Sequence, residues 1–148
     1  MAHPATTSDG CEKLERLRSF FTEHPELAVT SAYLFGSHAA GRAHRESDVD
    51  VGVLLSWERY PNRDERFEAR VRLGSELIHA LRENEVDVVV LNDAPPLFAR
   101  RIVWAGIRAY VADPDVDRDF VRDVQLRAAD VEPFLRRMRR RKLEAMLQ

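Results

Sequence analysis

Residues 35–50 read FGSHAAGRAHRESDVD, and this stretch decides how the rest of the chain is interpreted. An apolar run ends in Gly36-Ser37, ten residues intervene, and Asp-Val-Asp then opens a second apolar run. Side chains alternate between the two faces of a strand, so Asp48 and Asp50 share one face while Val49 points to the other. Two like charges at the start of a buried strand repel each other unless a cation compensates for them. The stretch therefore predicts two strands that meet at a charged site.

The pattern around this stretch predicts one α/β (α+β) domain over residues 1–148. Eleven residues, 37–47, join the first two strands, which is too short for a comfortable parallel crossover and favours antiparallel neighbours. We expect a mixed sheet flanked by helices, a flexible lead at 1–10 and a C-terminal helical extension at 115–148. The expected elements are a helix at 12–24, strands at 27–35 and 48–55, a helix at 62–84, a strand at 86–91, a short helix at 95–103, a strand at 107–111 and helix from 114 onward.

Apolar residues three or four apart predict which helix faces are buried. The first helix shows Leu14, Leu17, Phe20 and Phe21; the second shows Phe67, Val71, Gly74, Ile78 and Leu81; the last shows Val116, Phe120, Val124, Val131, Phe134 and Met138. Asn62 and Glu65 resemble a capping box at the start of the second helix. Pro133 should kink or divide the last helix, because proline lacks the amide hydrogen that the helix needs.

A third acid, Asp87, lies inside the expected strand 86–91. If that strand lies beside strand 48–55, its carboxylate joins those of Asp48 and Asp50. One carboxylate pair about 4 Å apart costs on the order of 4 kcal/mol at an effective dielectric constant near 20. Hard oxygen ligands without a zinc-like His or Cys pattern favour Mg²⁺. Two such ions suit in-line phosphoryl or nucleotidyl transfer.

Gly36 and Ser37 supply a candidate phosphate site. A glycine lets the backbone approach a phosphate closely, and the free amides of the residues after it can face an anion. Taken singly, these features are usually structural: Gly-Ser is a turn, Asp-x-Asp is a strand edge or cap, and Asp87 is a hydrogen-bonded acid. Their combination and order favour the functional interpretation.

This combination closely resembles a known family. FGSHAAGRAHRESDVDVGVLL (35–55) and VDVVVLNDAPPLFARRIVWAGIRAYV (86–111) resemble the polymerase-beta-like nucleotidyltransferases, and specifically the MntA-like minimal nucleotidyltransferase antitoxins that accompany HEPN-domain toxins. The resemblance implies that Gly36 and Ser37 hold the triphosphate and that Asp48, Asp50 and Asp87 bind two Mg²⁺ ions. Ser47 is a further nucleotide-binding candidate, and so is Arg42, because Ala40 stands where the family often has Arg.

By the same resemblance, the expected reaction transfers AMP from ATP to a tyrosine hydroxyl of a HEPN ribonuclease toxin, which neutralises that partner in a hetero-oligomer. Two alternatives stay open. The chain could modify a small-molecule hydroxyl, or it could be a non-catalytic antitoxin that acts by binding alone.

Charge and composition narrow the possible partners. Residues 136–142, RRMRRRK, carry six of the 23 Lys and Arg residues and no acid, so the remainder holds 17 basic against 25 acidic residues. An acidic body is poorly suited to nucleic acid, and we expect no direct contact with it. With no apolar run long enough for a bilayer and a single cysteine, Cys11, we expect a cytoplasmic protein. The basic run is either a solvated helix end or a contact with an acidic partner or RNA.

Overall fold

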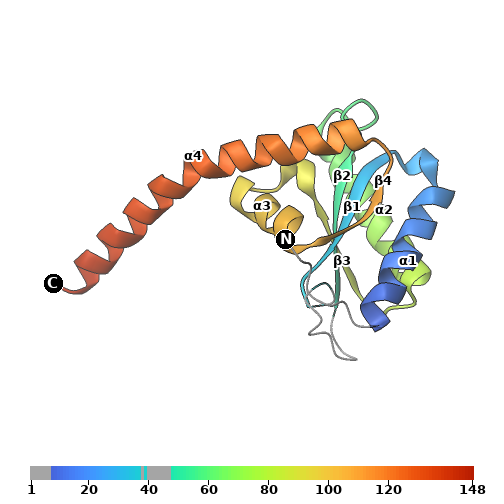
Figure 1. Ribbon diagram of the computed structural model, residues 1–148, viewed down its shortest axis with the longest axis horizontal. Helices are drawn as coiled ribbons and strands as arrows, with labels where there is room; N and C mark the ends of the chain where they lie inside the picture. The colour runs from blue at the N-terminus through green and yellow to red at the C-terminus, as the bar shows by residue number, and fades with distance from the viewer. Residues whose placement is uncertain (1–7, 38, 40–47) are drawn as a thin grey trace.

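The computed structural model describes residues 8–37, 39 and 48–148. Within these residues, four strands and four α-helices follow one another in the predicted order (Figure 1). The elements are α1 (Ser8–Glu23), η1 (Pro25–Leu27), β1 (Val29–Phe35), β2 (Val49–Leu55), α2 (Arg63–Leu81), β3 (Val86–Val90), η2 (Leu91–Asp93), α3 (Pro96–Ala105), β4 (Ile107–Val111) and α4 (Pro114–Met146). None of the helices in the described ranges is long and apolar enough to cross a membrane.

The four strands form one mixed sheet in the order β3-β2-β1-β4. β1 runs antiparallel to both β2 and β4, whereas β2 and β3 are parallel. The α/β fold class and the antiparallel pairing of the first two strands are therefore confirmed. The parallel pair is possible because α2 lies between β2 and β3 in the chain and provides the long crossover that parallel strands need.

Helices cover both faces of the sheet (Figure 1). One core lies between the sheet and α1 and α2, and it includes Val49, Val51 and Val53 from β2. The other core lies under α3 and the first half of α4, and it includes Leu54 of the same strand. Alternation along β2 thus sends the valines to one face and Asp50, Gly52 and Leu54 to the other. The acid-bearing face is the one that carries α3.

The first helix begins earlier than the sequence predicts. α1 starts at Ser8, and Gly10 within it is buried, so the expected flexible lead is wrong for residues 8–10; residues 1–7 lie outside the described residues. The predicted stripe is confirmed, since Leu17, Phe20 and Phe21 are buried and Leu14 packs against the same core.

The buried face of α2 differs from the predicted stripe. Phe67 and Val71 are 59% and 60% exposed, whereas the predicted Leu81 is buried and Ile78 packs against the core. Leu73 and Leu77, which are not part of the predicted stripe, are also buried. The helix carries two offset apolar stripes, and the sheet selects the one with the leucines. The predicted cap is confirmed in its first half, because the Asn62 side chain accepts a hydrogen bond from the Glu65 amide at 2.8 Å.

The predicted buried stripe of α4 is correct only for Phe120 and Val124, which are buried together with Ala128. Val116, Phe134 and Met138 are 39%, 55% and 52% exposed, and Val131 is half-buried. α4 extends beyond the sheet and the helices packed on it, so its later turns lie away from the rest of the described structure (Figure 1). Pro133 lies inside α4, which bends along its length but is not divided.

A buried polar cluster ties α4 to the sheet. The Tyr33 hydroxyl donates to Asp117 at 2.8 Å, and Arg108 donates to the other carboxylate oxygen at 3.1 Å. Asp117 is only 1% exposed, so it depends on these two donors for compensation. Burial, together with the hydrogen bond to Asp117, raises the pKa of the Tyr33 phenol well above its ordinary value.

This cluster predicts a loss of stability in alkali. Above about pH 10 the tyrosines of the unfolded chain lose their protons, whereas Tyr33 in the folded protein keeps its proton. The contribution of Tyr33 to the free energy of unfolding is therefore complete below about pH 10 and is lost as the pH rises toward the pKa of the folded state. Tyr33→Phe should cost about 1–3 kcal/mol at pH 8, because Asp117 loses a donor, and should flatten the alkaline slope. Urea unfolding at pH 8 and 11 measures both effects. Tyr110→Phe is the control and should keep the wild-type slope; equal slopes in all three proteins would contradict the assignment.

Candidate active site

Asp50 and Asp87 occupy directly paired positions on neighbouring parallel strands. Paired residues of adjacent strands point to the same side of a sheet, so both carboxylates lie on the face that carries α3. Asp48 comes two residues before Asp50 and, by alternation, belongs to the same face. Asp48 and Asp87 are exposed and Asp50 is half-buried. The strand of Asp87 therefore lies beside that of Asp50, which is the condition under which the three acids can meet.

Gly36 lies against this acidic edge. Phe35 at the end of β1 pairs with Asp50, and Gly36 follows with a φ of +76°, a conformation that side-chain-bearing residues rarely adopt. A Cβ built at Gly36 would lie 2.3 Å from Oδ2 of Asp50. Only glycine therefore fits here without moving the carboxylate. The fold brings the predicted Gly-Ser turn to the predicted acids.

The other nucleotide-binding candidates lie further along the connection to β2. Arg42 and Ser47, like Ala40, fall outside the described residues. Ser37 is described and half-buried, one residue beyond Gly36.

The acids fit a magnesium site by chemistry and by register. Adjacent strands lie about 4.8 Å apart, so carboxylates at paired positions can reach one hard cation, and oxygen-only donors suit Mg²⁺. Across the described ranges, however, no three His, Cys, Asp or Glu side chains are gathered closely enough to hold a metal ion. The three-carboxylate, two-ion site stays a prediction.

A surface pocket of about 380 Å³ lies along the outer strand β3, and its lining includes none of Gly36, Ser37, Asp48, Asp50 and Asp87. It is lined by residues of α2, β3, η2 and α3: Arg63, Asp64, Phe67, Arg70, Val89, Val90, Asp93, Ala94, Pro95 and Phe98. Val89 is two residues along β3 from Asp87, and the Phe98 ring packs edge-on against Phe35, with centroids 6.2 Å apart. The pocket is thus continuous with the strands that carry the acids. The sequence pattern does not reveal it, because Phe67 falls on the stripe that periodicity predicts to be buried.

One ion pair and two arginine hydrogen bonds to backbone carbonyls hold the wall of this pocket in place. Arg66 donates two hydrogen bonds of 2.9 Å to the carboxylate of Asp93 and a third to the Tyr60 carbonyl. The hydrogen bonds to Asp93 raise the pKa of Arg66 above its ordinary value. Arg70 donates to the Val88 carbonyl at 2.8 Å, so α2 is tied to the outer edge of β3. A two-point guanidinium–carboxylate contact restricts orientation as well as position.

Comparison with known proteins identifies the family. The family model described as polymerase beta, nucleotidyltransferase matches residues 15–115, a span from α1 to the start of α4 that includes Gly36, Asp48, Asp50 and Asp87. The chain belongs to the polymerase beta nucleotidyltransferase family. The fold predicted from the resemblance is confirmed, while the roles of individual residues in this nucleotidyltransferase domain remain predictions.

Relatives with described activities are also similar to this nucleotidyltransferase. It is 31% identical over 94 residues to the protein adenylyltransferase MntA of Shewanella oneidensis, and the match covers 64% of this chain and 63% of that protein. The match thus spans less than two thirds of the relative's length.

Solved structures share the fold at lower identity. A toxin–antitoxin structure with AMP-PNP aligns at 23% identity with a TM-score of 0.65, covering 91% of this chain and 98% of that one. The complex of tri-AMPylated Shewanella oneidensis HEPN toxin with MNT antitoxin aligns at 19% identity with a TM-score of 0.59, covering 93% and 99%.

Proposed function

We propose that this chain is a protein adenylyltransferase antitoxin, which transfers AMP from ATP to a tyrosine hydroxyl of a HEPN-domain toxin. The observation that carries the proposal is the paired register of Asp50 and Asp87 beside Gly36. Two like charges side by side on adjacent strands repel each other, so their presence together at one end of the sheet favours a role in binding cations.

The roles follow from this arrangement. Gly36 and Ser37, with Arg42 and Ser47, would hold the triphosphate of ATP. Asp48, Asp50 and Asp87 would hold two Mg²⁺ ions, which neutralise phosphate charge and activate the attacking hydroxyl when bound. The tyrosine oxygen attacks the α-phosphorus, the bond to the β-phosphate oxygen breaks, and pyrophosphate and a proton leave.

The pocket beside β3 favours a bulky acceptor. Its exposed Phe67 and Phe98 rings offer contact area to an aromatic side chain, and Val89 places it two residues from Asp87. The similarity to a protein adenylyltransferase and to structures of toxin–antitoxin complexes supports a protein acceptor in a hetero-oligomer. ATP as donor is supported by the AMP-PNP bound in one related structure. The single free cysteine, Cys11, fits a reducing cytoplasm.

Turnover separates this function from the two alternatives. A tenth of an equivalent of the chain with Mg²⁺ and labelled ATP should modify nearly all of its cognate HEPN-domain toxin. Modification should be seen as added AMP mass on tyrosine, and ribonuclease activity should stay lost after separation. Inhibition that needs equimolar protein, ignores ATP and reverses on separation would instead show a binding antitoxin. Label found only on small molecules would show the other transferase.

A further inference from the structure

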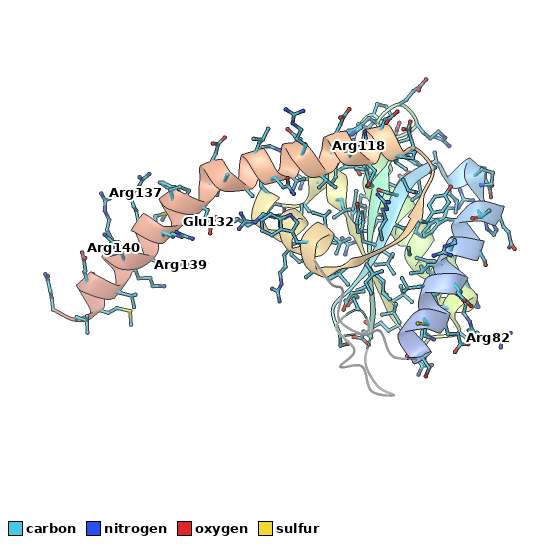
Figure 2. All side chains as sticks on the ribbon, in the orientation of Figure 1. Arg82, Arg118, Glu132, Arg137, Arg139 and Arg140 are labelled. Atoms are coloured by element: carbon cyan, nitrogen blue, oxygen red, sulfur yellow. The ribbon has the colours of Figure 1, made fainter. Side chains whose placement is uncertain are left out.

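The last helix has two parts with different surroundings. In its first part, Phe120, Val124 and Ala128 are buried, and an ion pair between Arg100 of α3 and Glu132 at 3.2 Å marks the end of this part. Beyond Glu132 the helix bends and runs away from the body, as Figures 1 and 2 show. We call residues 133–147 the terminal arm. It lies wholly outside residues 15–115, the family match.

The apolar face that packs on the body continues along the arm. Val124, Ala128, Val131, Leu135 and Met138 recur at intervals of three or four, which places them on one side of a helix. Within the body this side is buried, but on the arm Phe134, Met138 and Met146 are exposed. Leu135 is half-buried, so the arm presents an apolar stripe that is mostly exposed.

Basic residues flank this stripe. Residues 136–142 hold six Arg and Lys residues and no acid. Arg136 pairs with Glu132 at 2.8 Å, and the hydrogen bonds from Arg100 and Arg136 lower the pKa of Glu132. Within the described ranges, Arg137, Arg139 and Arg140 form no ion pair; Figure 2 shows them along the arm, away from the sheet. By helical spacing, Arg139 and Arg141 lie on the two sides of this stripe, whereas Arg137 and Arg140 lie on the far side of the helix.

A helix of this kind gains most of its stability from a surface that covers it. Isolated helices shorter than about 12–15 residues are marginal in water, and Pro133 removes one backbone hydrogen bond at the base of the arm. An amphipathic helix with anchors three and four residues apart suits an apolar groove on another protein.

We propose that the terminal arm is the docking helix for the acceptor protein and lies in an apolar groove rimmed by acidic side chains. This inference rests on the proposed function for the identity of that protein. RNA would neutralise the arginines but leave the apolar stripe uncovered. Two arms packed on each other would oppose six positive charges with six more. An acidic partner protein satisfies the charge and the stripe together.

Two variants of the full chain test the two halves of the interface. Phe134→Ser with Met138→Ser removes apolar anchors, and Arg139→Glu with Arg141→Glu reverses the charge beside them. Each pair should raise Kd for the cognate HEPN-domain toxin at least about tenfold, as expected when central interface anchors are lost. KM for AMP transfer should rise equally, with kcat unchanged. The charge variant should also flatten the dependence of Kd on salt.

Matched controls lie on the part of α4 that packs on the body. Leu126→Ser changes an exposed apolar residue there, and Arg118→Glu with Arg122→Glu makes the same charge change. Both should keep wild-type Kd and KM. All variants should keep the far-ultraviolet circular dichroism of the body, which shows that a loss of binding is not unfolding.

The outcomes separate this inference from the proposed function. Kd is measured without ATP, so a wild-type chain that transfers no AMP would contradict the proposed function and leave the docking test intact. Unchanged Kd in both arm variants would overturn the docking inference. It is also overturned if the arm variants lose only self-association in sedimentation, or only RNA binding, while HEPN binding stays at the wild-type level.

Discussion

Asp50→Asn and Asp87→Asn are each expected to lower kcat for AMP transfer by about 10³-fold, the loss seen when one preorganised charge-stabilising group is removed from an active site. Asn keeps the size of the side chain but cannot supply the negative charge that holds a divalent cation. The paired register of the two residues makes their losses interdependent, so the double variant should be little worse than either single one. Labelled ATP and single-turnover kinetics measure this.

The same variants should fold normally. Removing one of two opposed like charges should leave stability without Mg²⁺ unchanged or raise it by about 0.2–1 kcal/mol. The increase in Tm with Mg²⁺ and ATP, which comes from binding to the folded state, should disappear. Glu85→Gln is the matched control, because it neutralises an exposed acid two residues before Asp87. Full activity in the double variant would refute the site.

Gly36→Ala is expected to lower AMP transfer about 10²-fold, an effect of the size produced by a misplacement of about 1 Å in an active site. The new methyl group would begin 2.3 Å from Oδ2 of Asp50, so the carboxylate has to move. A non-glycine residue at a φ of +76° adds strain of about 1–3 kcal/mol. The loss should therefore appear in kcat and also, more modestly, in urea unfolding.

Gly74→Ala is the control for this change. Gly74 lies within α2, and the nearest atom to a Cβ there is the Val86 carbonyl oxygen at 4.0 Å, an ordinary contact. Alanine in a helix is favoured over glycine by about 0.5–1 kcal/mol, so this variant should be as active as wild type and slightly more stable. If Gly36→Ala were as active as Gly74→Ala, the close approach of Gly36 to Asp50 would have no role in the reaction.

The local sequence pattern was enough to predict the strands and to place the two acids at the start of β2 on one face. The limits of β4 match the prediction, and alternation placed Asp48 and Asp50 on one face, because the period of a strand is a property of the chain itself. The short connection 37–47 was enough to make β1 and β2 antiparallel, since chain length limits the crossover. The sequence also identified Gly36 as a candidate residue, but only the structure shows how close it lies to Asp50.

Where the sequence offered more than one apolar pattern, only the tertiary structure decided which residues are buried. Two apolar stripes on α2 are nearly equal in sequence, and contact with the sheet buried the leucines and left Phe67 to line the pocket. The position of Asp87 opposite Asp50 depends on strand register, which is set by packing across the whole sheet. On α4 the apolar face continues past Ala128, but its residues are no longer buried where the helix extends beyond α3 and the sheet. Periodicity is local and could be read from the residues; burial depends on which surfaces meet, and that is decided by the fold.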